Sequence, residues 1–231
     1  MPLTDAERLT IEFGDAEPVS GLLISPPGAR ACCVLAHGAG AGMTHPFMAA
    51  AAAGLAQRGV ATLRYQFPYM EKKSRRPDPP KLAQATVRAA VAAASGRLSD
   101  LPLFAGGKSF GGRMTSQAQA AEPMPQVRGL VFLGFPLHPA ERPSDERADH
   151  LLAIRIPMLF LQGDRDALAE PSFLRPVVDR LGDLATLELF ADADHSFHVP
   201  ARSGRTDREV LDDVLDRLAT WIDATLATAR S

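Results

Sequence analysis

Hydrophobic and polar positions along the chain follow two periods. Short apolar runs, each bounded by glycine, proline or a polar turn, alternate with longer stretches in which apolar residues recur three or four positions apart. The short runs predict strands at 8–13, 19–26, 31–38, 60–67, 101–107, 127–135, 156–163 and 184–190. The longer stretches predict helices at 45–59, 82–98, 112–122, 171–182 and 207–229, with a short helical stretch around 145–153.

The order of these elements predicts the fold class. The first two strands flank the turn-like stretch Gly-Asp-Ala-Glu-Pro and indicate an antiparallel hairpin. Strands and helices then alternate, which is typical of parallel βαβ units whose sheet is covered by helices on both faces. Because the sequence contains no internal repeat, low-complexity segment or interdomain linker, residues 1–231 are expected to form a single α/β domain.

Composition and charge exclude several classes of protein. The formal net charge is −2, so no overall field attracts nucleic acid or an anionic membrane. No apolar stretch approaches the length of a membrane span, and the N-terminus lacks a signal-peptide pattern. The adjacent Cys32 and Cys33 point to opposite faces of a strand, which fits buried thiols in a reducing compartment. We therefore expect a cytoplasmic protein with neither nucleic-acid nor membrane partners, whose oligomeric state is open.

Candidate chemistry lies just after the predicted strands. In an open parallel sheet, ligands bind beyond the carboxyl ends of the strands. The glycine-rich stretch 37–42 overlaps one such end, and the sequence Gly-Lys-Ser-Phe-Gly around Ser109 follows another. Asp166 and His195 follow the strands 156–163 and 184–190. Serine, acid and histidine therefore appear in this order along the chain at three strand ends.

A serine flanked by glycines between a strand and a helix is the pattern of a nucleophile elbow. The tight turn strains the serine backbone and exposes its hydroxyl, and side chains at the flanking glycines would collide with neighbours. We expect Ser109 to be the nucleophile, His195 the base and Asp166 the acid that orients it. The backbone N–H groups of Phe110 and Ala39 are expected to form the oxyanion hole.

Two neighbouring residues compete for these roles. Asp164 also follows its strand, but we expect it to hydrogen-bond the backbone of its own loop, as aspartate does in turns. His198 lies three residues beyond His195, where the chain is expected to head back toward the terminal helix. Phe197 between them is expected to anchor the loop by packing.

The stretches "LAHGAGAGMTHPFM", "RYQFPYMEKKSRRPDPP", "FAGGKSFGGRM" and "DADHSF" resemble a bacterial family of small, lidless predicted α/β-hydrolases. That family is itself similar to a eukaryotic hydrolase-like domain of a chromatin-acetylation complex. The resemblance implies an α/β-hydrolase fold: a mostly parallel central sheet, an N-terminal antiparallel hairpin, helices on both faces and no cap domain. The chain also resembles dienelactone-hydrolase-like proteins, whose nucleophile is cysteine where this chain has Ser109. The segment between Phe135 and Ile154 is too short for a large cap, so we expect an open site for small acyl groups.

Besides His195 and His198, four histidines need an interpretation. His37 is a candidate substrate-binding residue, although a role in bracing the glycine-rich loop is favoured. His45 either caps the following helix or lines the pocket, and His138 follows a strand and is a candidate for facing the pocket. His150 is expected at the surface. Because no Cys/His cluster has metal-ligand spacing, neither a metal nor a cofactor is expected.

Basic residues supply further substrate-binding candidates. Lys108 lies within the elbow, and its side chain either approaches the pocket or bends away to solvent. The basic, proline-rich loop 71–81 is either a solvated connection or a cationic rim for an anionic substrate, with Arg75 and Arg76 as the candidates.

Two functions from different classes fit these features. The first is a serine hydrolase that cleaves small carboxylic esters or thioesters through an acyl-enzyme, with peptides as a variant. The second is a non-catalytic or weakly catalytic scaffold that binds partners, as the eukaryotic relatives suggest. The complete set of Ser109, Asp166 and His195 favours the enzyme. Dehalogenases and epoxide hydrolases need a carboxylate at the elbow and are disfavoured.

Overall fold

The computed structural model of the chain describes residues 6–14 and 16–228. Residues 1–5, 15 and 229–231 lie outside this description, so it does not cover the ends of the predicted domain 1–231, part of the hairpin turn, or the last residue of the predicted helix 207–229. The strands are β1 (Glu7–Phe13), β2 (Ala16–Ile24), β3 (Ala31–Ala36), β4 (Val60–Tyr65), β5 (Leu103–Lys108), β6 (Val127–Leu133), β7 (Met158–Gly163) and β8 (Ala185–Phe190).

Helices connect most of these strands. The α-helices are α1 (Pro46–Gln57), α2 (Pro68–Glu71), α3 (Pro80–Arg97), α4 (Phe110–Ala121), α5 (Pro171–Leu181) and α6 (Asp207–Thr228). Three short 3₁₀ helices complete the set: η1 (Glu146–Ala153), η2 (Gly182–Leu184) and η3 (Ala201–Ser203).

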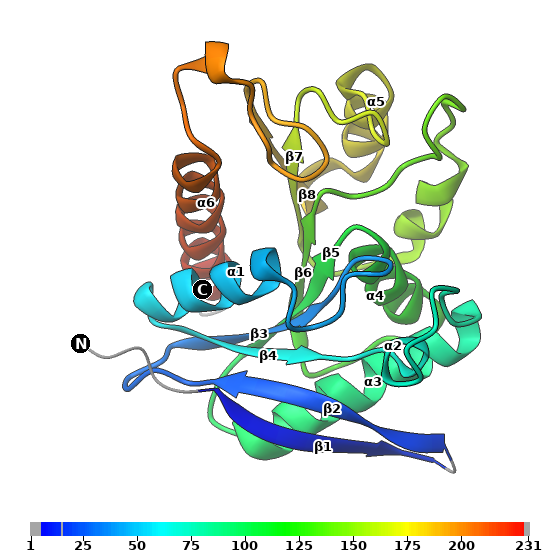
Figure 1. Cartoon of the computed structure of the whole chain (residues 1–231), viewed down its shortest axis with the longest axis vertical. Coiled ribbons are helices and arrows are strands. Elements are labelled where there is room, and N and C mark those ends of the chain that lie inside the picture. The colour runs from blue at the N-terminus through cyan, green and yellow to red at the C-terminus, as the bar shows by residue number, and fades with distance from the viewer. Residues whose placement is uncertain (1–5, 15, 229–231) are drawn as a thin grey trace.

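The eight strands form one twisted sheet in the order β1-β2-β4-β3-β5-β6-β7-β8 (Figure 1). β1 pairs with β2, and β2 with β4, in antiparallel fashion, whereas the pairs from β4 through β8 are parallel. The predicted antiparallel hairpin and mostly parallel sheet are therefore confirmed. Because the parallel strands point the same way, their carboxyl ends meet along one edge.

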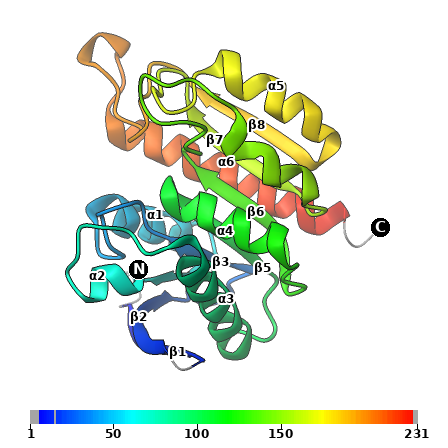
Figure 2. The ribbon, with the colours of Figure 1, turned by 90° about the vertical axis from the view of Figure 1, so that its right-hand side faces the viewer.

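Helices cover the sheet on both faces, as predicted. α1 and α6 lie on one face, and α3, α4 and α5 lie on the other (Figures 1 and 2). Along β3 the side chains alternate between these layers. Cys32 and Val34 belong to the core under α3, α4 and α5, whereas Cys33 and Leu35 belong to the core under α1 and α6. This period of two, with both faces buried, explains why the strand reads as a continuous apolar run.

The structure departs from the predicted elements in two connections. The four-residue helix α2 precedes the basic loop and was not predicted; Pro68 begins it, at a position where the missing proline N–H costs no helical hydrogen bond. The predicted helical stretch around 145–153 is the 3₁₀ helix η1. Between β6 and β7 the described chain forms no helix other than η1, so a cap domain is absent there.

Candidate active site

Ser109 stands at a sharp turn between β5 and α4. Its backbone adopts φ 50° and ψ −117°, a left-handed conformation that costs a non-glycine residue about 1–3 kcal/mol. A Cβ atom on Gly107 would come within 2.1 Å of the Ala36 carbonyl oxygen, and one on Gly111 within 2.6 Å of the His37 carbonyl oxygen. The neighbouring strand β3 therefore excludes side chains two residues before and two residues after the serine.

The structure brings Ser109, His195 and Asp166 together at the carboxyl ends of β5, β8 and β7. His195 Nε2 lies 2.8 Å from Ser109 Oγ, and His195 Nδ1 lies 2.6 Å from Asp166 Oδ2. With the Nδ1 proton directed at the carboxylate, Nε2 is the acceptor for the serine hydroxyl. The three side chains thus form one line of hydrogen bonds.

Asp166 is held from several sides. Its side chain is buried; Oδ1 accepts the Leu168 N–H at 2.8 Å, and Oδ2 accepts a hydrogen bond from the Gln162 amide. Gln162 in turn accepts the Phe135 N–H at 2.8 Å. Asp164 is exposed, and no hydrogen bond to its carboxylate occurs in the described part of the chain, so the expectation that it braces its loop is wrong. Asp166 itself closes that turn.

The loop that carries His195 is fastened by its neighbours. Asp194 Oδ1 accepts the N–H groups of Ser196 and His198, at 2.7 and 3.0 Å. Phe197 is buried and stacks on Phe47 with ring centroids 6.0 Å apart, which confirms the predicted packing anchor. The exposed His198 turns to Asp207, with Nδ1 2.9 Å from Oδ2, and this contact raises the pKa of the imidazole.

Lys108 binds the same loop from the elbow. Its ammonium donates a hydrogen bond to the His195 carbonyl oxygen and lies 5.9 and 5.6 Å from the ring centroids of Phe47 and Phe197. Burial lowers the pKa of Lys108 to about 8, although Asp166 and Asp194 oppose the shift. Of the two alternatives for Lys108, neither holds: the side chain points behind His195 rather than into the substrate pocket or out to solvent.

A pocket of about 430 Å³ opens beside Ser109. Ala39 and Phe110, the predicted oxyanion-hole residues, line it together with the serine. His138 also lines it, as expected, and its Nε2 lies 2.6 Å from Glu170 Oε2. Prolines and aliphatic side chains make up much of the rest of the wall.

The other predicted pocket residues lie elsewhere. His37 is fully buried and braces the glycine-rich loop, with Nδ1 2.7 Å from the Gly38 carbonyl oxygen and Nε2 accepting the Phe67 N–H at 3.1 Å. Burial lowers its pKa to about 4, so it stays neutral. His45 is exposed and caps α1, where Nδ1 accepts the Phe47 N–H at 3.2 Å.

The basic loop reaches the pocket through different residues from those predicted. Arg75 and Arg76 are exposed and do not line the pocket, whereas Pro77 and Asp78 of the same loop do. His150 was expected at the surface but is partly buried against α4, where its Nε2 lies 2.7 Å from Ser116 Oγ.

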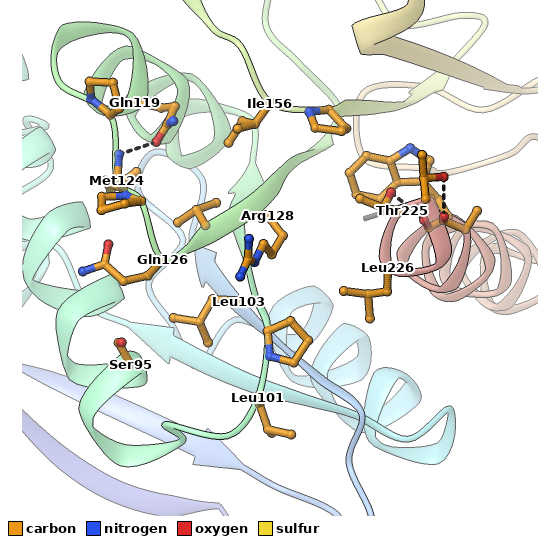
Figure 3. Close-up of a pocket in the computed structure, with 18 of the residues that line it drawn as sticks. Ser95, Leu101, Leu103, Gln119, Met124, Gln126, Arg128, Ile156, Thr225 and Leu226 are labelled. Carbon is orange, nitrogen blue, oxygen red and sulfur yellow. Dashed lines mark hydrogen bonds between the residues drawn. The ribbon is translucent and has the colours of Figure 1, made fainter. Parts of the chain in front are cut away.

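A larger cavity of about 1120 Å³ lies at the opposite end of the sheet (Figure 3). Leu103, Arg128 and Leu226 lie around it, where β5 and β6 begin and α6 ends. Neither Ser109, His195 nor Asp166 reaches it. The smaller pocket is therefore the candidate active site.

Residues 6–14 and 16–228 contain neither a cluster of metal-ligating side chains nor a helix that could span a membrane. No three His, Cys, Asp or Glu side chains gather there as a metal site would require. Among the helices of the same residues, none is both long and apolar enough to cross a membrane.

The parallel sheet, the strained serine after β5 and the aspartate and histidine after β7 and β8 define the α/β-hydrolase class of protein. The chain belongs to the alpha/beta hydrolase domain family, whose model matches residues 29–223. The expected resemblance to lidless hydrolases is also met among solved structures, which share the fold at low sequence identity. The relation to a domain of a chromatin-acetylation complex stays a prediction.

Three solved structures illustrate this likeness. Dienelactone hydrolase from Anabaena variabilis superposes with a TM-score of 0.78 at 21% identity, over 96% of this chain and 98% of that one. A serine hydrolase without a lid from Xanthomonas campestris gives 0.69 at 22% identity, over 94% and 98%. An esterase domain from Rhodothermus marinus gives 0.71 at 16% identity, over 94% and 98%.

Sequence reasoning missed four residues around the site. Gln162 and Asp194 orient the triad loops, but a buried glutamine in a strand and a second aspartate in a loop carry no recognisable motif. Arg113 and Arg147 line the pocket. Only Arg113 had a usable signal, because it follows Ser109 by four residues, one turn along the predicted helix.

Proposed function

We propose that this chain is a serine hydrolase that cleaves small carboxylic esters or thioesters through an acyl-enzyme intermediate on Ser109. The observation that carries the proposal is the continuous line of hydrogen bonds from Ser109 Oγ through His195 to Asp166, at 2.8 and 2.6 Å, beside an open pocket. The names of the structural neighbours, which include a serine hydrolase and an esterase domain, support the same reaction class.

In the proposed first half-reaction, Ser109 Oγ attacks the carbonyl carbon while His195 Nε2 takes the hydroxyl proton. The oxyanion that forms accepts hydrogen bonds from the N–H groups of Phe110 and Ala39. The Phe110 N–H suits this role because the first N–H groups of a helix have no intrahelical acceptor. Collapse breaks the bond to the alcohol or thiol, which leaves with the proton from His195.

In the second half-reaction, water attacks the acyl group on Ser109. His195 Nε2 takes a proton from this water, and the second tetrahedral intermediate collapses to the free acid and the serine hydroxyl. Asp166 Oδ2 accepts a hydrogen bond from the Nδ1–H of His195 throughout and stabilises the imidazolium that forms in each half. Because no cap covers the site, we expect catalytic efficiency to fall as the acyl chain lengthens from acetate to decanoate.

Labelling with a fluorophosphonate tests the proposal. The expected result is one adduct per chain, located on the peptide that contains Ser109, together with hydrolysis of short-chain esters. Ser109→Ala should abolish both, whereas Ser172→Ala, which changes an exposed serine on α5, should be labelled normally. Labelling of a different serine, or none in folded protein, would refute the proposal and favour a binding scaffold instead.

A further inference from the structure

Two arginines line the pocket without an acidic partner among the described residues. At the surface, Arg30 pairs with Asp223 and Arg217 with Glu188. Within the described part of the chain, neither Arg113 nor Arg147 is in an ion pair, and the buried Nε of Arg113 has no hydrogen-bond partner. A buried donor without an acceptor is costly, so this arrangement calls for an acceptor from outside the chain.

The charges of Arg113 and Arg147 are near enough to act on each other, in the pocket that also contains Ser109. All three residues line the same pocket. Burial lowers the pKa of Arg113, and the charge of Arg147 lowers it further, which means that two like charges face one partly desolvated space. An anion between them would remove this repulsion and satisfy the free donors.

Both arginines are held by the fold. Arg113 lies one turn along α4 from the serine, and its N–H donates to the Ser109 carbonyl oxygen at 3.1 Å. One helical turn rises ~5.4 Å, and helical side chains lean toward the helix N-terminus, here toward Ser109. Arg147 lies on η1, which is fastened to α4 by the hydrogen bond between Ser116 and His150, 2.7 Å long.

None of the nearby acidic residues of the described chain forms an ion pair with either arginine, including Glu146 and Asp149, which lie beside Arg147 on η1. Asp78 is the acidic residue of the pocket lining, and its carboxylate accepts the Tyr69 N–H at 3.0 Å without pairing with either arginine. Asp145, close to Arg147 in the chain, pairs with Arg180 at 2.9 Å. The lining therefore has two cationic side chains against one acidic one.

We propose that the pocket selects esters that carry a carboxylate, and that Arg113 and Arg147 bind this group while Ser109 attacks the ester carbonyl. A carboxylate matches the planar donor fork of a guanidinium, and the spacing of one helical turn suits a short acyl or alcohol chain between the two groups. The inference rests on the proposed function and narrows its substrate class. The reaction consumes one water; it yields a diacid and an alcohol when the carboxylate is on the acyl side, and an acid and a hydroxy acid when it is on the alcohol side.

Matched substrates test the preference for charge. Monoethyl glutarate and ethyl valerate differ by a carboxylate on the acyl side of the ester. 4-Acetoxybenzoate and methyl 4-acetoxybenzoate differ by a carboxylate on the alcohol side of the acetyl ester. We expect kcat/KM for at least one charged ester to exceed that of its neutral counterpart by about tenfold to hundredfold, the usual effect of hydrogen bonds to a charged group.

Variants then locate the recognition. Arg113→Gln and Arg147→Gln, each checked for folding by thermal unfolding, should raise KM for the charged ester more than KM for the neutral ester, so that the preference for charge falls. The double variant of Arg75→Gln and Arg76→Gln is the matched control, because these arginines are exposed outside the pocket. It should keep the preference. Since Arg147 lies on a surface 3₁₀ helix, its variant serves if Arg113→Gln does not fold.

Direct binding separates the inference from the proposed function. Calorimetry should detect glutarate binding to wild type and not to the Arg147→Gln variant. If no ester is cleaved but glutarate binds through these arginines, the hydrolase proposal fails and the anion site stands. Equal or faster cleavage of neutral esters, a preference that survives both arginine variants, or no glutarate binding would each overturn the inference. Tighter binding of inorganic phosphate than of glutarate would also overturn the choice of a carboxylate.

Discussion

Replacing Lys108 by Met tests why a charged group lies behind the proposed catalytic histidine. The substitution removes the ammonium that donates to the His195 carbonyl oxygen, while an unbranched apolar side chain still fills the space near Phe47 and Phe197. The variant therefore separates the charge from the packing.

The expected effect on stability follows from the pKa of Lys108. Burial lowers this pKa from 10.5 to about 8. Such a shift corresponds to about 3 kcal/mol against the charged form in the folded state. At pH 7 the lysine is charged in both the folded and the unfolded state, so wild type buries a charge that the Met variant lacks. We therefore expect the free energy of unfolding of the variant to be up to about 3 kcal/mol higher than that of wild type.

This difference should disappear as the pH rises. The folded chain releases the lysine proton near pH 8, whereas the unfolded chain holds it until about pH 10.5. Between these values the unfolded state binds more protons, so the stability of wild type rises with pH relative to the variant. Urea unfolding of both proteins across this interval measures the difference directly, and other titrating groups cancel because both proteins share them.

Activity should move in the opposite direction. Without the ammonium, the carbonyl oxygen of His195 loses a hydrogen-bond donor and the histidine is held less firmly. We therefore expect kcat to fall about tenfold or more with little change in KM, so that the variant gains stability and loses activity. Lys81→Met, which changes an exposed lysine at the start of α3, is the control and should alter neither property. A stability difference that does not vary with pH, or an unchanged kcat, would refute the reasoning.

Two further predictions concern the triad. His195→Ala should abolish ester turnover while the melting temperature stays near that of wild type, whereas His198→Ala should keep most activity, because His198 pairs with Asp207 at the surface; the reverse result in steady-state assays would move the base to His198. Asp166→Asn should lower kcat by about 10⁴ by stabilising the wrong histidine tautomer, whereas Asp164→Asn should be nearly silent, and a dead Asp164→Asn would exclude the proposed acid.

Periodicity was sufficient to predict the sheet because its parallel strands are buried on both faces. The six apolar residues of β3 alternate between two helical layers, and the shortness of this run together with the glycine-rich stretch after it indicated a strand rather than a helix. The connections between these strands were harder to predict from the sequence. α2 has four residues in a proline-rich stretch, which is too short to show a helical period, whereas η1 was predicted as a helical stretch but without its 3₁₀ geometry.

The elbow was predictable because steric crowding allows only glycine at positions 107 and 111. Gly107 and Gly111 face the end of β3 so closely that no side chain fits, and such constraints leave a motif in the sequence. Asp194 acts within its own loop, on the N–H groups of Ser196 and His198, whereas Gln162 and Lys108 bond groups distant in the chain, Phe135 and His195. Their partners can be identified only when the fold brings β5, β7 and the loop after β8 together.

On the proposal above, the segment between β6 and β7 lets a chain without a cap select its substrate. An open pocket buries little of a ligand, so shape alone discriminates weakly between small acyl groups. Charge can supply the missing selectivity. An unpaired guanidinium in a partly buried site forms charged hydrogen bonds with a carboxylate and forms none with a neutral chain of the same length. η1 brings Arg147 beside Arg113 and Ser109 with a single short helix. Selection by charge then requires only two side chains, where enclosure of the substrate would require a domain.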